Sequence, residues 1–119
     1  MSEFKNLIVW QKSMDMVVKI YPKINMLPKE ERFCLGQQMR NSAVSVPSNI
    51  AEGQARNSIK EFIHHLNFSK GSAAELETQL LVCERLGYLE KDDINDVIEQ
   101  LHLIDAMINK LIFSLKKQL

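Results

Sequence analysis

The chain has 119 residues, enough for one domain with a single hydrophobic core. Its fifteen basic and fifteen acidic residues balance, so no overall charge attracts it to nucleic acid or to an anionic membrane, and any such binding needs a local patch. Four glycines and three prolines leave little material for turns, which favours long helices over many short strands. We therefore expect an all-α protein with one domain over residues 1–119.

The sequence contains no signal for export, metal binding through cysteine, or membrane insertion. Cys34 and Cys83 are its two cysteines and lack the CxxC spacing of zinc and redox motifs. No stretch reaches the roughly 18 apolar residues that a membrane span needs. We expect two reduced thiols in a cytoplasmic protein that makes no membrane contact.

The first helix is predicted over residues 5–24, with Pro22 bending or ending it. Its apolar residues at spacings of three and four predict an inner face of Leu7, Trp10, Met14, Val17, Val18 and Tyr21. Val9, Met16 and Ile20 fall on nearly the opposite side of the helix. This second apolar stripe is either a contact with another subunit or a set of ordinary exposed apolar residues.

The second helix is predicted over residues 28–54, because proline suits a first helical position and acidic residues suit the positive end of the helix dipole. Its inner face is predicted to hold Leu35, Met39, Ala43, Val46 and Ile50. A stripe of polar residues lies alongside that face: Gln38, Ser45, Asn49 and Glu52. Pro47 lies inside the helix and predicts a kink, since it removes one backbone hydrogen bond.

The third helix is predicted over residues 59–86. Ser58 and Glu61 match a capping box, and Gly87 suits the left-handed residue that follows a helix. Residues 71–74 are nearly without side-chain bulk, and glycine inside a helix costs on the order of 1 kcal/mol against alanine. We therefore expect another backbone to approach closely at Gly71.

The fourth helix is predicted over residues 91–116, with acidic residues in its first turns and lysines at its end. Its inner face is predicted to hold Ile94, Val97, Ile98, Leu101, Ile104, Ile108 and Leu115. Four amphipathic helices joined by short links predict an antiparallel up-down-up-down four-helix bundle.

Catalytic arrangements fit this pattern poorly. Helices three and four each carry a Glu-x-x-His motif, ending at His64 and His102, of the kind that holds two irons in some bundles. His64 and Glu99 of these motifs point away from the apolar faces, and the heights of the two histidines along the bundle differ by about 18 Å at the helical rise. Serines inside a helix lack the strained placement of a catalytic nucleophile. We expect a protein that is not an enzyme and holds no cofactor or metal.

The polar stripe of the second helix has a counterpart on the third. Its members are Glu61, His65, Ser72 and Glu75. Buried polar groups need partners, so we expect the two stripes to hydrogen-bond across a helix pair or across a subunit boundary. Arg40 is expected to form an ion pair with Glu75 or Glu77. Our hypothesis is an interface network that fixes register.

Basic residues form two loose groups, Lys5, Lys12, Lys19 and Lys23 on the first helix and Arg40, Arg56 and Lys60 around the central stretch. Such groups are commonly solvated surface. In a ring of subunits, however, each patch is repeated, and phosphate binding depends on the summed charge.

Five motifs resemble one protein family across nearly the whole chain. They are FKNLIVWQK (residues 4–12), LGQQMR (35–40), SVPSNIAEG (45–53), GSAAEL (71–76) and LGYL (86–89). The chain resembles the four-helix-bundle proteins encoded in intervening sequences of bacterial 23S ribosomal RNA genes. The resemblance implies a left-handed up-and-down bundle, a homopentameric ring, and kinship with the basic accessory protein of diversity-generating retroelements. Asn41 departs from the family, which often has a second arginine there, and so do Ser69 and Lys70, where small apolar residues are usual.

We expect a non-enzymatic, ring-like homo-oligomer, most simply a pentamer, that binds RNA or a ribonucleoprotein. The alternative is a protein–protein interaction module without nucleic-acid binding. The candidate interface or partner-binding residues are Gln38, Arg40, Ser45, Pro47, Asn49, Glu52, Gly53, Gly71, Ser72 and Glu75.

Overall fold

The computed structural model describes residues 3–119 and confirms an all-α fold. The elements in chain order are η1 (Glu3–Asn6), α1 (Ile8–Ile24), η2 (Lys29–Glu31), α2 (Leu35–Ala55), α3 (Ile59–Arg85) and α4 (Lys91–Lys116), where η marks a short 3-10 helix. The first helix therefore begins at Ile8 rather than near residue 5, and it passes through Pro22 without ending there.

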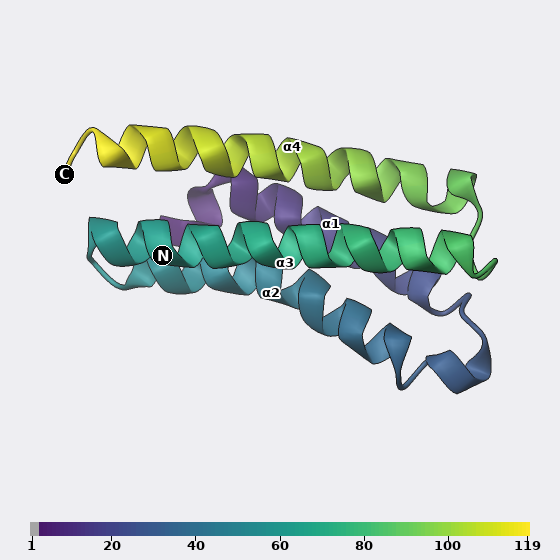
Figure 1. The fold of residues 1–119 in the computed structure, drawn as a ribbon. Helices are drawn as coiled ribbons and strands as arrows, with labels where there is room; N and C mark the ends of the chain where they lie inside the picture. The colour runs from purple at the N-terminus through teal and green to yellow at the C-terminus, as the bar shows by residue number, and fades with distance from the viewer. Residues whose placement is uncertain (1–2) are drawn as a thin grey trace.

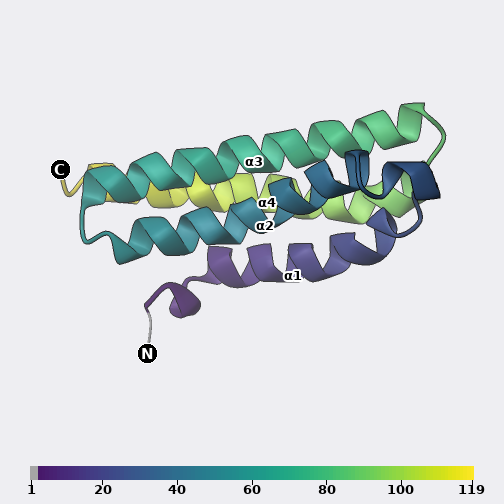
Figure 2. The same cartoon turned by 90° about the horizontal axis from the view of Figure 1, so that it is seen from below.

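Each helix runs antiparallel to the next, so Glu3 and the C-terminus lie at one end of a rod of 46 × 21 × 21 Å (Figures 1 and 2). Side-chain contacts confirm the directions. Lys23 at the end of α1 lies 3.2 Å from Asp96 near the start of α4, whereas Gln100, further along α4, donates to the Lys12 carbonyl at 3.0 Å. α1 packs against α2 and α4, and α3 packs against the same two helices, so α1 and α3 lie on a diagonal.

Local capping explains where α3 and α4 begin and where α3 stops. The Ser58 hydroxyl accepts from the Glu61 amide at the start of α3, as predicted. Glu90 and Asp93 form a capping box at the start of α4. Gly87 has φ +78°, the left-handed conformation that follows the end of α3. The predicted bounds of these two helices are therefore confirmed to within one residue.

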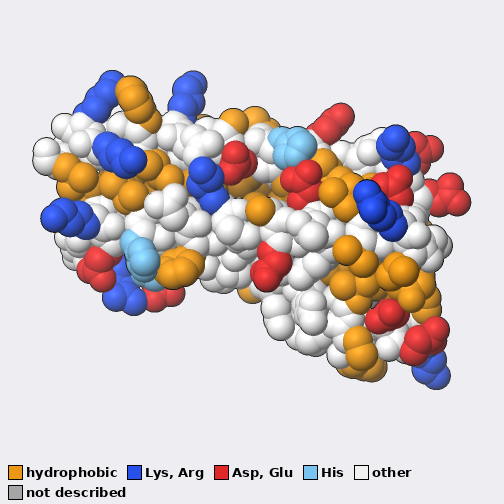
Figure 3. All heavy atoms as spheres, viewed as in Figure 1, with side chains coloured by type: hydrophobic (Ala, Val, Ile, Leu, Met, Phe, Trp, Pro, Cys, Tyr) orange, Lys and Arg blue, Asp and Glu red, His pale blue; other side chains and the backbone are white. Residues whose placement is uncertain are grey.

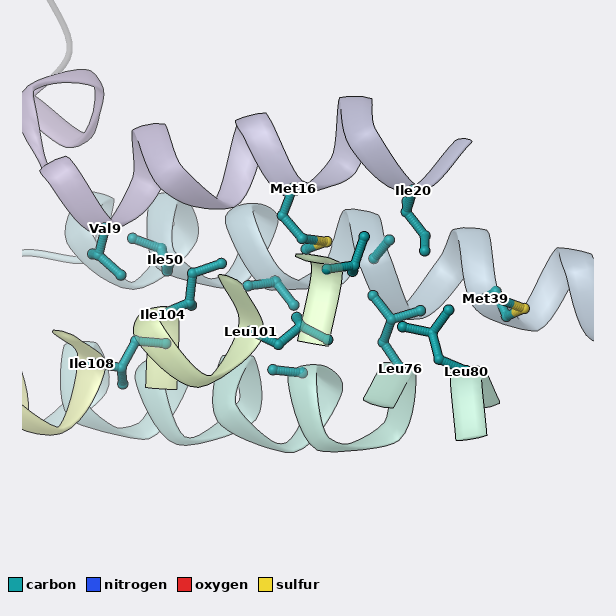
Figure 4. Packing of buried hydrophobic residues seen from close by; sticks show 14 of the residues in the cluster. Val9, Met16, Ile20, Met39, Ile50, Leu76, Leu80, Leu101, Ile104 and Ile108 are labelled. Atoms are coloured by element: carbon teal, nitrogen blue, oxygen red, sulfur yellow. The ribbon is translucent and has the colours of Figure 1, made fainter. Parts of the chain in front are cut away.

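The prediction for the faces of α1 is wrong in part, since of the residues expected inside only Leu7, Trp10 and Val17 pack against the core. Val9, Met16 and Ile20, expected on the outside, are buried at 4%, 0% and 0% exposure and point into the core (Figure 4). Of the residues expected inside, Val18 is 72% exposed, and Met14 and Tyr21 are exposed as well. The stripe of Val9, Met16 and Ile20 is thus closed to another subunit.

Ser13 is the physical reason for this inversion. It lies between Val9 and Met16 on the buried face, where a polar residue interrupts the apolar pattern. Its hydroxyl donates to the Val9 carbonyl at 2.7 Å, which satisfies the buried group inside its own helix. The true inner stripe, Val9-Ser13-Met16-Ile20-Ile24, is therefore hidden by one serine.

The start of the second helix also differs from the prediction. The chain after Pro28 forms only the turn η2, and a break at Cys34 (φ −114°, ψ −93°) separates it from α2. Arg40 stabilises the break by donating to the Arg32 carbonyl at 2.7 Å. Gly36 lets the break pack tightly, because a Cβ there would lie 3.2 Å from the Glu31 carbonyl oxygen.

Pro47 is buried inside α2, which changes direction part-way along its length (Figure 1). The predicted kink is therefore present. Next to the proline, the buried Ser69 of α3 donates to the Val46 carbonyl at 2.8 Å. This bond ties α3 to α2 at the bend.

All four helices contribute large side chains to one hydrophobic core (Figure 4). The fully buried members include Met16, Ile20, Met39, Ile50, Leu66, Leu76, Leu80, Leu101, Ile104 and Ile108. The inner faces predicted for α2 and α4 lie in or against this core.

Candidate functional site

The two predicted polar stripes meet along one line between α2 and α3, which we call the polar seam. Its members are Ser42, Ser45, Asn49, Glu52 and Arg56 of α2 and its cap, and Glu61, His65, Ser72 and Glu75 of α3. The bonds follow antiparallel order, because residue numbers rise along α2 as they fall along α3. The expectation that the stripes hydrogen-bond across a helix pair is confirmed, and the pair lies within one chain.

Away from the α2–α3 link, serine and asparagine side chains form most of the bonds of the seam. The Ser42 hydroxyl donates to Glu75 at 3.0 Å, and the Ser72 hydroxyl donates to the Ser45 oxygen at 2.9 Å. The Asn49 amide nitrogen donates to Ser45, while its oxygen faces His65 Nδ1 at 3.2 Å. These bonds fix the register of the two helices, since a shift of one residue would break all of them together.

Charged groups form the end of the seam near the α2–α3 link. Arg56 lies 2.7 Å from Glu52 and 3.3 Å from Glu61. The hydrogen bond from Arg56 holds the pKa of Glu52 below its usual 4.5, and the Glu52 carboxylate raises the pKa of Arg56. All three side chains are exposed, so the cluster stabilises the fold only modestly.

At Gly53, α2 approaches α3 closely. A Cβ at this position would lie 2.8 Å from the Cβ of His65 and 3.0 Å from a ring carbon of Phe62. Gly71, where we expected a close approach, has no described atom within 4 Å of its Cβ position. That expectation is wrong within the chain, since the close contact is at the other glycine.

The predicted ion pairs of Arg40 are also wrong. Arg40 turns toward the start of α2, where it bonds to Arg32 and to Gln37 Oε1 at 3.2 Å. Glu75 instead accepts from Ser42, and Glu77 lies 3.0 Å from His102 Nε2. The sequence pattern placed Arg40 on the correct helix, but the free carbonyl of the preceding turn attracts its guanidinium.

A polar cleft of about 340 Å³ opens along the seam on the N-terminal side of the bend in α2. Its lining consists of Gln38, Asn41, Ser42, Ser45, Ser72, Glu75 and Gln79. The sequence predictions included Gln38, Ser45, Ser72 and Glu75, but missed the other three. Gln79 lies four residues after Glu75, so extending the polar stripe by one helical turn would have found it.

An apolar groove of about 300 Å³ lies on the other side of α2, between α1 and α2. Its lining consists of Trp10, Met14, Val17, Val44, Pro47, Ser48 and Ala51. Pro47 therefore belongs to this groove rather than to the polar seam. Ile8 and Val18 add further exposed apolar surface on α1.

Charge is divided unequally along the rod. The end made of residues 3–6, 52–61 and 110–119 holds three acidic residues, Glu3, Glu52 and Glu61, and six basic ones, Lys5, Arg56, Lys60, Lys110, Lys116 and Lys117. The opposite end, made of residues 23–36 and 84–96, holds five basic and seven acidic residues. Figure 3 shows blue side chains gathered on the left of the rod and red ones on the right. We call the first region the basic end.

A protein-family model for the 23S rRNA-intervening sequence proteins matches residues 5–110. The chain belongs to this family. The resemblance inferred from the five motifs is thereby confirmed, and the match covers all of α1, α2 and α3 and most of α4. No curated protein matches the chain.

A solved structure shares the fold of this 23S rRNA-intervening sequence protein. It is a protein of unknown function from the S23 ribosomal protein family of Bacteroides thetaiotaomicron. The two chains superpose with a TM-score of 0.81 at 24% identity, over 88% of this chain and 98% of that one. At this identity the likeness extends to the fold and not to particular side chains.

Among the described residues of the chain, the structure shows neither a group of metal-binding side chains nor a helix that could span a membrane. Within residues 3–119, no three His, Cys, Asp or Glu side chains are grouped so that they could hold a metal ion. His64 stacks edge-on against Phe68 at 4.6 Å, whereas His102 faces Glu77 on the α4 side of α3. None of the described helices is apolar over a length that could cross a bilayer.

Proposed function

We propose that this family member is a non-enzymatic homo-oligomeric scaffold, a ring of five copies, that binds RNA through its basic end. The observation that carries the proposal is the exposed apolar surface of α1, where Met14 lines the apolar groove and Val18, one helical turn further on, is 72% exposed. Exposed apolar surfaces of this kind mark contacts with other proteins.

The arrangement of apolar surface favours a ring over a two-fold dimer. A second exposed apolar set lies on α3, which is diagonal to α1 in the bundle. Its members are Phe68 and Val82 of α3 and Leu86, the residue that follows the helix. Two unlike surfaces on different faces suit a head-to-tail contact, and repeated head-to-tail contacts close into a ring when the rotation permits.

The basic end supports RNA as the partner. Its surplus of three positive charges is small in one chain, but a ring with its subunits aligned would repeat the surplus in every copy. Phosphate binding depends on the number of charges that reach the backbone, so a neutral chain can still bind RNA at one end of its assembly.

A gel-shift titration of a structured RNA hairpin at two salt concentrations tests this proposal. The key variant replaces Lys60, Lys116 and Lys117 by glutamine, and the matched control replaces Lys29, Arg85 and Lys91 at the opposite end. We expect wild-type affinity to fall with salt, and the basic-end variant to bind more weakly with a shallower salt dependence. The control variant should keep its affinity to within about threefold, since those charges lie far from the RNA.

Two results would refute the RNA proposal. One is no shift at low salt, and the other is an equal loss of affinity in both variants, which would point to net charge alone. An oligomer that binds no RNA would leave the protein–protein interaction module as the function.

A further inference from the structure

An aromatic side chain, Phe113, lies on the outside of the basic end. It belongs to α4 and is 64% exposed, whereas Ile112 and Leu115 of the same turn are buried in the core. A single exposed apolar residue is common on protein surfaces, so its surroundings decide whether it has a role.

Lysines surround this ring. Residues three and four positions apart are neighbours on a helix surface, and three of the four such neighbours of Phe113 are Lys110, Lys116 and Lys117. All three lysines are exposed, and Lys117 Nζ lies 4.6 Å from the centre of the ring. Figure 3 shows blue and orange side chains next to each other over the C-terminal part of α4, at the upper left.

The acidic residues of the basic end have partners elsewhere. Glu52 and Glu61 both pair with Arg56, and Glu3 accepts a hydrogen bond from the Gln54 side chain at 2.9 Å. No acidic residue follows position 105 in the sequence. The lysines around the ring are therefore free to contact an anionic ligand.

The other exposed phenylalanines of the described chain, Phe33 and Phe68, lack such surroundings. Phe33 follows the turn Lys29–Glu31 and Arg32, which carry charges of both signs. Phe68 stacks edge-on against His64 at 4.6 Å. An exposed ring among several lysines is thus particular to α4 in the part of the chain that the structure describes.

The lysines indicate the kind of ligand. A protein contact centred on Phe113 would bury their ammonium groups, and lysine is depleted in the cores of protein interfaces. A nucleic-acid strand fits the group better, because an unpaired base can stack on the ring while its flanking phosphates reach the lysines. Lys117 covers one face of the ring and leaves the other for a base. Bases within a duplex are already stacked on one another, so the group selects unpaired ones.

We propose that Phe113 and the lysines around it bind unpaired bases of single-stranded RNA. This inference rests on the RNA binding proposed for the basic end, and it states which part of an RNA the end takes: a loop, a bulge or a free strand. The contacts proposed for the ring lie on α1 and α3, so the outer face of α4 stays open to the strand.

Fluorescence anisotropy with two labelled strands tests this site. One strand is an oligouridine of about 12 nucleotides, a length that single-strand-binding proteins cover, and the other has the same number of phosphates but abasic sugars. We expect the wild type to bind oligouridine about tenfold more tightly than the abasic strand, which is a typical gain from stacking one base. Equal affinities for the two strands would overturn the proposal.

Variants of Phe113 separate stacking from charge. Phe113→Leu keeps an apolar, helix-favouring side chain without the aromatic ring, so it should bind oligouridine about tenfold more weakly and the abasic strand unchanged. Phe113→Trp should bind oligouridine at least as well as the wild type, because it keeps an aromatic face. The matched control, Phe33→Leu at the opposite end, should bind both strands as the wild type does. Wild-type affinity of Phe113→Leu for oligouridine, or an equal loss for both strands, would overturn the proposal.

The same measurements distinguish a failure of this site from a failure of RNA binding. If neither strand binds at low salt, both proposals are wrong. If both strands bind equally and only the lysine variant of the basic end loses affinity, RNA binding stands and stacking on Phe113 is wrong. Light scattering should give Phe113→Leu the same mass as the wild type. A lower mass would show that the ring contacts another subunit, which would also overturn the stacking proposal.

Discussion

Replacing Gly53 by alanine tests whether α2 and α3 are held at the spacing that the structure shows. The new Cβ would lie 2.8 Å from His65 Cβ and 3.3 Å from Phe62 Cα, atoms that are fixed to the backbone of α3 and cannot rotate away. Overpacking of this kind costs about 1–3 kcal/mol. The gain in helix propensity from glycine to alanine is at most about 1 kcal/mol.

Gly71→Ala is the matched control, because its Cβ would meet no described atom within 4 Å. The propensity gain largely cancels between the two variants, so their difference in unfolding free energy measures the clash, about 1–3 kcal/mol. Urea unfolding followed by circular dichroism gives this difference. We expect Gly53→Ala to be less stable than wild type and Gly71→Ala to be equally or more stable. Equal stability of the two variants would refute the reasoning.

Three further predictions follow from burial and charge. At pH 8 a thiol reagent should modify the exposed Cys34 quickly and Cys83 slowly, because burial raises the pKa of the Cys83 thiol to about 11; two fast thiols would contradict this burial. Arg56→Gln should return the pKa of Glu52 toward 4.5 in an NMR titration, because it removes the hydrogen bond that lowers this pKa. In the wild type the ion pair stabilises the fold above pH 4.5, and this stabilisation is lost as the pH falls through the lowered pKa. Met16→Ala should lower the free energy of unfolding in urea by about 2–5 kcal/mol, because Met16 is fully buried. A loss under about 0.5 kcal/mol would contradict this burial and indicate that the opposite face of α1 packs in the core.

The boundaries of α3 and α4 were predictable because their signals are local. Ser58 and Glu61 lie three residues apart at the helix start, and Gly87 needs only its own left-handed conformation at the end. Such signals depend on a few neighbouring residues, so the sequence displays them directly.

The inner face of α1 was not predictable in the same way. Both sides of this helix are apolar, and Ser13 interrupts the side that is buried. Which side faces the core depends on packing against α2 and α4, and the satisfied hydroxyl of Ser13 removes the penalty that would have excluded it.

The candidate site was predicted in part for a related reason. Antiparallel pairing of two helical stripes follows from periodicity, and the stripes do meet, as in the hydrogen bond from Ser72 to Ser45. The cleft depends on the course of the bent backbone, and the position of Arg40 depends on a carbonyl freed by the break before α2. Neither feature repeats with a period that a sequence can show.

Light scattering of the purified chain at micromolar concentration tests the central claim of assembly most directly. The account predicts a mass of about five times the 13.7 kDa of one chain, and a lower mass for Val18→Glu, which places a charge on the exposed surface of α1. A wild-type mass of one chain would contradict it.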